Sequence, residues 1–253
     1  MSSGPVSRRS RVERVGGTVR RPVEPGGTRV HELLLALEDI GFPYSPRFLG
    51  IDDEGREVLT WIDGESGPAG WSMVVPEAGL RRFARLLHEV HSATADLGLP
   101  ADSWVGGRSA PQPDWVMCHG DFGPWNVVWD GPEPVGIIDW DFAGPAPVAD
   151  DVAYALEYVT PFRDDDEAVR WLRYSSAPDR RRRAEIFCDA YGLDIDDVPA
   201  AVAARQEQDI ERVLALASIG VEPQATWVAE GVEAELRQRV AWTRTAGASS
   251  FSA

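Results

Sequence analysis

The segment 116–144, VMCHGDFGPWNVVWDGPEPVGIIDWDFAG, most constrains the fold because it combines short apolar runs with regularly placed polar residues. The apolar runs 125–129 and 135–140 flank the turn-forming residues 130–133, which predicts a β-hairpin. Asp121 and Asn126 lie five residues apart, and Asp139 follows Asn126 by thirteen, at the end of the run 135–138. An Asp at the end of such a strand is well placed to hold a metal ion.

These three residues are the set that phosphoryl transfer requires. A loop Asp orients and deprotonates a hydroxyl, while an Asn and a second Asp hold Mg²⁺. Magnesium prefers a few oxygen ligands together with substrate phosphates, and Asn126 and Asp139 both offer oxygen. The competing interpretation is that Asp and Asn simply cap loops, which they favour in any case.

The motif His119-Gly120-Asp121-x4-Asn126, followed by Ile138-Asp139-Trp140-Asp141, resembles the signature of the aminoglycoside phosphotransferase family. These are kinase-like small-molecule phosphotransferases. The resemblance covers about residues 12–245 and includes the segments 46–65, 86–93 and 151–156. It implies an ATP- and Mg²⁺-dependent enzyme that phosphorylates a hydroxyl group of a small molecule.

The resemblance also implies a role for each residue of the motif. Asp121 would be the catalytic base, and Asn126 and Asp139 would be the Mg²⁺ ligands. His119 and Asp151 would be structural residues that support the catalytic loop. The role of Asp141 stays open between capping the loop and binding a second metal ion.

The N-terminal region departs from the family pattern because the chain contains no lysine, and all 25 basic residues are Arg. Kinase-like folds use a strand Lys to hold the nucleotide phosphates, so Arg20 or Arg21 must serve here. Alternation with Val19 along the strand favours Arg21, whereas the family's spacing before the proline favours Arg20, which we prefer. Trp61 and Ile62 occupy the position of the hinge that faces the purine. The acidic partner of the cation, expected near residue 30, is not apparent, since Glu32 is the only acid there before Glu38.

The expected fold is α+β and bilobal, like a protein kinase. Apolar and turn patterns predict strands within 11–22, 47–52 and 56–61 and a helix over 30–40. Helical periodicity follows over 76–94, and helices are expected near 149–159, 165–174, 179–191, 197–219 and 226–243. We therefore expect a truncated N-lobe over 1–62, a helical C-lobe over 63–245 and a disordered tail over 246–253.

Charge excludes some classes of protein. The chain carries 25 Lys+Arg against 41 Asp+Glu, a net charge of −16, which disfavours binding to nucleic acid. The sequence lacks an apolar run of membrane-spanning length and a signal-peptide pattern at its start. We expect a cytoplasmic protein with no nucleic-acid or membrane partner, and the pattern does not predict its oligomeric state.

The acceptor is less constrained. The acidic cluster that includes Asp164 and Asp165 would suit a polyamine-like acceptor such as an aminoglycoside or another amino-sugar antibiotic, but acids there also cap helices. Trp125, inside the catalytic loop, is a candidate for stacking on a sugar. Two alternatives remain: a kinase of choline, homoserine or a sugar, and a pseudokinase-like protein that binds without transfer.

Overall fold

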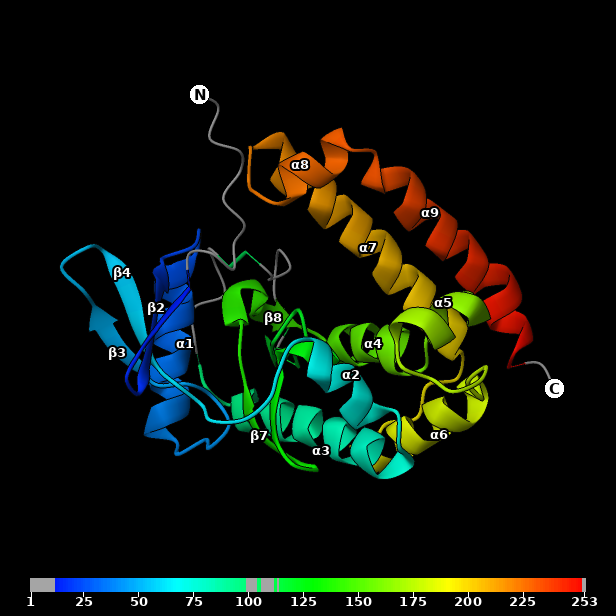
Figure 1. The fold of residues 1–253 in the computed structure, drawn as a ribbon, viewed down its shortest axis with the longest axis horizontal. Helices are drawn as coiled ribbons and strands as arrows, with labels where there is room; N and C mark the ends of the chain where they lie inside the picture. Colours follow the sequence, from blue (N-terminus) through cyan, green and yellow to red (C-terminus); the bar gives the residue numbers. More distant parts are fainter. Residues whose placement is uncertain (1–11, 99–103, 106–111, 113, 252–253) are drawn as a thin grey trace.

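The N-terminal end of the molecule is a four-stranded antiparallel sheet with one helix against it. The computed structural model describes residues 12–98, 104–105, 112 and 114–251. The strand order is β1-β2-β4-β3, with α1 beside the sheet (Figure 1). The elements are β1 (Glu13–Val15), β2 (Thr18–Pro22), α1 (Gly27–Asp39), β3 (Phe48–Ile51) and β4 (Arg56–Thr60). The basic start of the chain, residues 1–10, for which the sequence predicts partial disorder, lies outside the described residues.

The connector after β4 is tied to the hairpin of the segment 116–144, which we call the catalytic hairpin after its predicted role. Glu65 and Trp129 exchange two backbone hydrogen bonds of 2.8 and 2.9 Å, and the Gly67 amide donates to the Trp125 carbonyl at 2.8 Å. Helices α2 (Pro68–Val74) and α3 (Glu77–Thr94) follow. The connector therefore fixes the sheet relative to the hairpin, and the boundary at residue 62 stays a prediction.

The hairpin lies between the sheet and the helical part of the molecule (Figure 1). It consists of β6 (Val127–Asp130) and β7 (Glu133–Ile137), as the apolar runs predict. A second antiparallel pair, β5 (Val116–Cys118) with β8 (Gly144–Ala146), brackets it in sequence. Two 3₁₀ turns, Pro124–Asn126 and Trp140–Phe142, complete the two loops of the motif.

The rest of the chain is helical. The helices are α4 (Val148–Val159), α5 (Asp165–Trp171), α6 (Arg180–Tyr191), α7 (Val198–Ser218), α8 (Gln224–Ala229) and α9 (Val232–Trp242). The single helix predicted over 226–243 is wrong, because the chain breaks at Gly231, where φ is 90°. The predicted disorder from residue 246 is also wrong through Phe251, since a π-helical turn spans Thr243–Gly247 and Phe251 stacks on Phe162.

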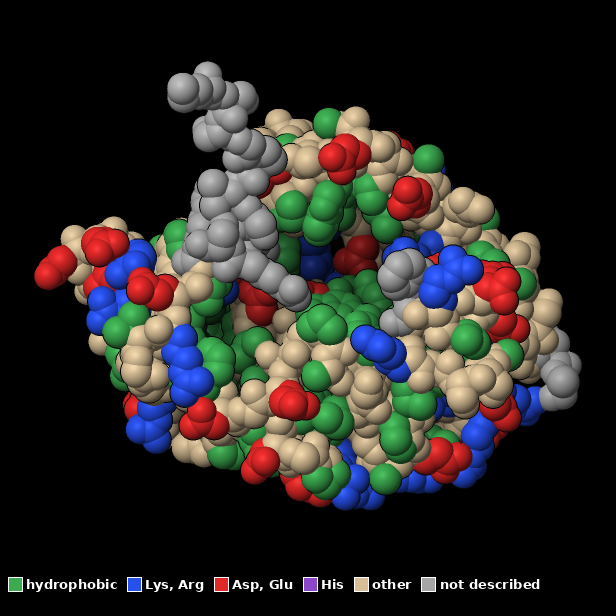
Figure 2. All heavy atoms as spheres, viewed as in Figure 1, with side chains coloured by type: hydrophobic (Ala, Val, Ile, Leu, Met, Phe, Trp, Pro, Cys, Tyr) green, Lys and Arg blue, Asp and Glu red, His purple; other side chains and the backbone are tan. Residues whose placement is uncertain are grey.

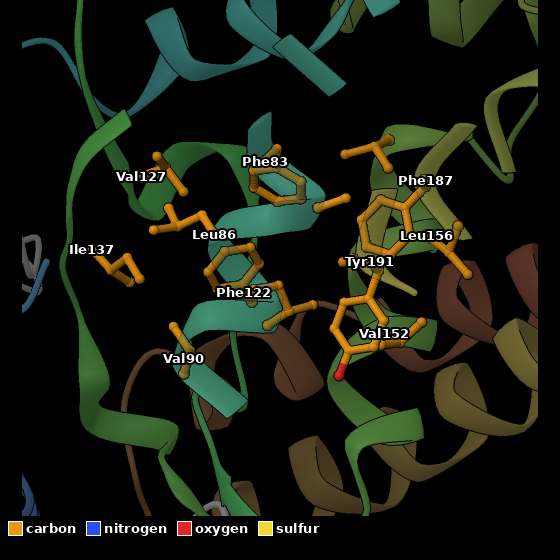
Figure 3. Packing of buried hydrophobic residues seen from close by; sticks show 14 of the residues in the cluster. Phe83, Leu86, Val90, Phe122, Val127, Ile137, Val152, Leu156, Phe187 and Tyr191 are labelled. Carbon is orange, nitrogen blue, oxygen red and sulfur yellow. The ribbon is translucent and has the colours of Figure 1, made fainter. Parts of the chain in front are cut away.

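The core joins the catalytic hairpin to the helices. Helix α3 buries Phe83, Leu86 and Val90, which follow helical spacing along one face. Figure 3 shows Leu86 and Val90 toward the hairpin and Phe83 between Phe122 and Phe187. The ring of Phe122, in the loop that carries Asp121, lies 4.7 Å from that of Phe83. This contact anchors the loop to the core. Over the described residues, we find no helix with the length and apolar character that crossing a bilayer demands.

Candidate active site

The catalytic loop leaves β5 at His119 and turns sharply at Gly120. Gly120 has φ of 79°, and a side chain there would place its Cβ 2.0 Å from the carbonyl oxygen of Phe142. The position therefore requires glycine. Because Phe122 is fully buried on the other side, the Asp121 side chain between them has a fixed position.

Asp151, at the start of α4, holds this loop by its backbone amides. Its carboxylate accepts the amides of His119 at 2.6 Å and Gly120 at 2.9 Å. His91 lies 3.2 Å from the same carboxylate. Burial raises the pKa of Asp151, but the hydrogen bond and charge of His91 and the backbone amides outweigh it and lower the pKa to about 2.

His119 is fully buried, and its Nε2 lies 3.1 Å from the carbonyl oxygen of Ile138. Burial lowers the pKa of its imidazole. The ring therefore links the loop that follows β5 to the strand end before Asp139.

Both oxygens of Asp121 accept hydrogen bonds. The Asn126 side-chain amide donates to Oδ2 and to the Asp121 carbonyl, each at 2.9 Å. The Tyr154 hydroxyl donates to Oδ1. Burial raises the pKa of Asp121 to about 7, with a further rise from the charge of Asp139, against the lowering effect of the Tyr154 and Asn126 hydrogen bonds. Asp121 is thus a fixed carboxylate with the pKa of a general base at neutral pH.

Arginines from α7 support Tyr154 and the loop. The Arg205 guanidinium lies 4.8 Å from the centre of the Tyr154 ring and donates to the Gly120 carbonyl at 3.2 Å. Its other partner is Asp209, with which it forms an ion pair one helical turn away. None of the three residues Tyr154, Arg205 and Asp209 was predicted from the sequence motif. Tyr154 had one available signal, because it lies three residues after Asp151 and so faces the same side of α4.

The second loop presents two carboxylates to an arginine. Asp139 has a positive φ of 64°, a left-handed conformation that Asp tolerates better than most residues. Arg21 donates to Asp141 at 2.6 Å and to Asp139 at 3.3 Å. Asp141 is 8% exposed, whereas the Asp139 side chain is 39% exposed. Asp139 is therefore the more accessible of the two carboxylates.

Arg21, not Arg20, faces this site, so our preference for Arg20 is wrong. Val19 and Arg21 both line the pocket between the sheet and the hairpin, as strand alternation requires. The Arg20 guanidinium instead lies 3.6 Å from Asp52. The family's spacing before the proline predicted a cation one residue too early. Because neighbouring residues of a strand point to opposite faces, this shift of one residue selected the wrong face of β2.

The acidic partner of Arg21 comes from a strand rather than a helix. Glu57 on β4 accepts from Arg21 at 2.5 Å and is 2% exposed. His31 of α1 lies 2.7 Å from its other oxygen. Glu32, the acid considered from sequence, pairs with Arg29 at 2.7 Å. The available signal was that Glu57 shares the inward face of β4 with Leu59, where a charge needs a partner.

Two pockets meet at Trp125. A pocket of about 590 Å³ lies between the sheet and the hairpin and includes Arg21, Asn126 and Asp139 in its walls. A second pocket of about 530 Å³ lies against α7, α8 and α9 and includes Asp121. Trp125 lines both, so the Asp121–Asn126 pair lies at their junction. After the roles that the family resemblance predicts, we call the first the nucleotide-facing pocket and the second the acceptor pocket.

The predicted hinge residues Trp61 and Ile62 line the nucleotide-facing pocket. The Trp61 amide donates to the Gly17 carbonyl at 2.8 Å, so it is used within the sheet. The Arg14 guanidinium lies 4.2 Å from the centre of the Trp61 ring. Trp61 is therefore fixed at the edge of the sheet, beside the pocket.

The acidic cluster is not part of either pocket, and the suggestion that it contacts substrate is wrong. Asp164 caps α5 by accepting the Asp166 amide at 2.9 Å, and Asp165 forms an ion pair with Arg180 at 2.7 Å. Neither residue lines the acceptor pocket. Helix capping explains the cluster.

The donor chemistry of the nucleotide-facing pocket fits Mg²⁺. Asn126 spends its amide nitrogen on Asp121, which leaves its oxygen as the atom available for a cation. Asp139 adds a partly exposed carboxylate on the wall of the same pocket. Hard oxygen donors from one or two side chains are what Mg²⁺ uses beside phosphates.

Comparisons with known proteins agree with this geometry. The model of the phosphotransferase enzyme family (APH) matches residues 101–186. The trifolitoxin immunity protein of Rhizobium leguminosarum bv. trifolii is 36% identical over 192 residues, which cover 73% of this chain and 71% of that protein.

Solved structures resemble the fold. A choline/ethanolamine kinase family protein from Mesorhizobium loti matches with a TM-score of 0.52 and 18% identity, over 96% of this chain and 93% of that one. The GDP complex of aminoglycoside 2'-phosphotransferase-IIIa matches with a TM-score of 0.55 and 16% identity, over 89% and 87%. The expected bilobal, kinase-like α+β fold is confirmed.

Proposed function

Because the chain belongs to the phosphotransferase enzyme family and is thus a phosphotransferase with an alcohol group as acceptor, we propose that it uses Mg²⁺ and a nucleoside triphosphate. Asp121 is the catalytic base, Asn126 and Asp139 hold the metal ion, and Arg21 binds the nucleotide phosphates. His119 and Asp151 keep the catalytic loop in place. The acceptor is a small molecule that enters the acceptor pocket.

The observation that carries this proposal is the position of Asp121 where the two pockets meet. Its side chain lines the acceptor pocket, while its hydrogen-bond partner Asn126 lines the nucleotide-facing pocket. An acceptor hydroxyl beside Asp121 is therefore next to the end of a nucleotide held by Arg21. Positioning of this kind supplies most of the catalysis in phosphoryl transfer.

The reaction follows from that placement. Asp121 orients the acceptor hydroxyl and accepts its proton late in the step. The acceptor oxygen forms a bond to the γ-phosphorus, and the bond from that phosphorus to the β–γ bridging oxygen breaks. The electron pair of the broken bond stays on the nucleoside diphosphate, so atoms and charge balance. Asn126 and Asp139 would hold Mg²⁺, which would neutralise charge on the phosphate oxygens.

The direct test combines binding with turnover. The purified chain is titrated with ATP and with GTP, with MgCl₂ and with EDTA, and followed by thermal shift. Nucleotide consumption is then screened over amino-sugar antibiotics and hydroxyl metabolites, including choline and homoserine. We expect Mg²⁺-dependent stabilisation and at least one acceptor. If the chain binds neither nucleotide nor metal, the kinase proposal is wrong. If it binds nucleotide but phosphorylates no acceptor, the result supports the alternative of a pseudokinase-like protein that binds without transfer.

A second function is supported by the relative that is 36% identical and named an immunity protein. We propose that phosphorylation of a toxin hydroxyl protects the cell that makes this chain. Expression in toxin-sensitive bacteria tests this, with Asp121→Asn as the matched variant. Protection by the wild-type chain alone supports immunity through phosphoryl transfer. Equal protection by both chains assigns immunity to binding instead.

A further inference from the structure

The acceptor pocket is mostly apolar where the C-terminal helices enclose it. Figure 2 shows a hollow beneath α8 with hydrophobic side chains around it and charged side chains at depth. The apolar wall is built from three helices. It consists of Val213 and Leu216 from α7, Trp227 from α8, and Val232 and Leu236 from α9.

The opposite wall is aromatic. Trp125 and Tyr158 meet edge to face with their ring centres 4.7 Å apart, and both line the pocket together with Tyr154 and Phe142. A ligand that fills this space must bury apolar surface on both sides. A strongly hydrated polyamine gains little from such walls.

The charged groups of the pocket do not favour a polycation either. Its lining includes two carboxylates, Asp121 and Asp209, and two guanidinium groups, Arg212 and Arg239. Asp209 is already paired with Arg205, and Asp121 is held by Tyr154 and Asn126. No carboxylate of the described lining is thus available to a second or third ammonium group.

The Arg212 guanidinium uses few of its N–H donors within the described structure. Among the residues that the structure describes, its one hydrogen bond is a long contact of 3.4 Å to the Gly120 carbonyl. Its guanidinium also lies 5.9 Å from the centre of the Phe142 ring. A guanidinium has five N–H donors in a fork that matches a carboxylate. Arg212 is therefore a site for an anionic group at the pocket floor.

Gln224 is a buried polar residue of the same pocket. The residue is 5% exposed and lines the pocket, and its Oε1 has no hydrogen-bond partner in the described structure. This oxygen is itself inaccessible to solvent, so Gln224 contributes to the pocket wall and is not a contact for the acceptor.

We infer that the acceptor is a hydroxy acid with an apolar or aromatic body, held by its carboxylate on Arg212 and its hydroxyl on Asp121. This inference rests on the proposed function of Asp121. The two polar contacts lie close together, because Arg212 contacts the carbonyl of Gly120, the residue before Asp121.

The test uses three probes that differ in charge. N-benzyloxycarbonyl-L-serine has the aromatic body, hydroxyl and carboxylate, its primary amide lacks the negative charge, and gentamicin is a polycation. Binding is measured by calorimetry with Mg²⁺ and a non-hydrolysable ATP analogue, and turnover is measured by mass spectrometry of the product. We expect the acid to bind about tenfold or more tightly than the amide, as for one charge-assisted hydrogen-bond pair.

Two arginine variants separate the pocket from general charge effects. Arg212→Gln should bring the acid-to-amide ratio close to one, and Arg212→Lys should restore part of it. Arg237→Gln is the control, since Arg237 lies on α9 but pairs with Glu233 outside the pocket. Nucleotide affinity should be the same in all four chains, which also shows that the variants fold.

Equal binding of acid and amide, no binding of either, or tighter binding of gentamicin overturns the inference. Loss of nucleotide binding by the wild-type chain is a different failure, which overturns the proposed function. The nucleotide titration is made first, so the two failures are distinguished.

Discussion

The nucleotide-facing pocket and the acceptor pocket share Trp125 but are built differently. The first takes its charged groups from strand β2 and from the two loops of one hairpin, with Arg21 facing Asp139 and Asp141. The second takes most of its wall from α7, α8 and α9, which come late in the chain. The nucleotide-facing pocket thus joins a strand and two loops that lie more than a hundred residues apart in the chain, whereas the acceptor pocket takes most of its wall from the faces of three consecutive helices.

Their electrostatics also differ. In the nucleotide-facing pocket Arg21 is surrounded by three carboxylates, those of Glu57, Asp139 and Asp141, so a divalent cation is favoured there. In the acceptor pocket the Arg205–Asp209 and Arg239–Glu157 pairs are each neutral, and Asp121 and Arg212 add one charge of each sign. A cation beside Asp139 in the nucleotide-facing pocket and an anion beside Arg212 in the acceptor pocket fit this difference in charge.

The largest effect is expected where the pockets meet. Asp121→Asn should lower kcat about 10²–10⁴-fold, since it removes the base that accepts the proton. Nucleotide binding should stay close to that of the wild type, because Asp121 does not line the nucleotide-facing pocket. Steady-state kinetics and a nucleotide titration measure the two quantities. Turnover within a few-fold of the wild type would remove Asp121 from catalysis.

The next comparison is between the two proposed metal ligands, Asn126 and Asp139. Asp139→Ala should weaken Mg²⁺-dependent nucleotide binding more than Asn126→Ala, because a carboxylate attracts the cation more strongly than an amide. Asn126→Ala should also lower kcat, because the side-chain amide of Asn126 donates a hydrogen bond that holds the Asp121 carboxylate. Calorimetry with MgCl₂ gives the affinities, and equal values for the two variants contradict the ranking.

Arg21 and Arg20 test the sheet side of the site. Arg21→Ala should weaken nucleotide affinity by about 1.5–3 kcal/mol, as expected for a lost charge-assisted hydrogen bond. Arg20→Ala should change it little, because Arg20 lies on the other face beside Asp52. Nucleotide titrations of both variants measure this. Wild-type affinity in both would show that β2 does not bind the phosphates.

The sequence allowed the hairpin, its polar residues and the helical C-terminal part to be predicted, because local patterns determine them. Asp121, Asn126 and Asp139 lie beside short apolar runs separated by turn-forming residues, and this pattern strongly favours a β-hairpin. The choice between Arg20 and Arg21 required the strand register, and Glu57 required knowledge of which face of β4 is buried. Tyr154 and Arg212 are helix residues whose neighbours are set by tertiary packing, so periodicity alone could not distinguish them from core or surface.

Asp151 supports both pockets through the loop, and its effect is expected on stability. Its pKa of about 2 lies below the ordinary 3.8, so its contribution is fully present above pH 4. It is lost as the pH falls towards 2, and it amounts to about 2 kcal/mol. Asp151→Asn should therefore be destabilised at pH 7, with a difference from the wild type that shrinks between pH 4 and 2. Urea unfolding at several pH values measures the difference, and a constant value contradicts the assignment.

The smallest effect is expected on the acceptor side of the junction. Tyr154→Phe removes the hydroxyl that donates to Asp121 and keeps the ring beside Arg205. One lost hydrogen bond to a charged group is worth about 1.5–3 kcal/mol at most, and water from the pocket can replace part of it. We expect kcat to fall about tenfold with nucleotide affinity unchanged. Tyr174→Phe is the control, since its hydroxyl donates to the Val159 carbonyl away from both pockets. If the Tyr154 and Tyr174 variants have the same kcat, the hydroxyl of Tyr154 does not position Asp121, and the Asn126 amide is the side-chain group that holds this carboxylate.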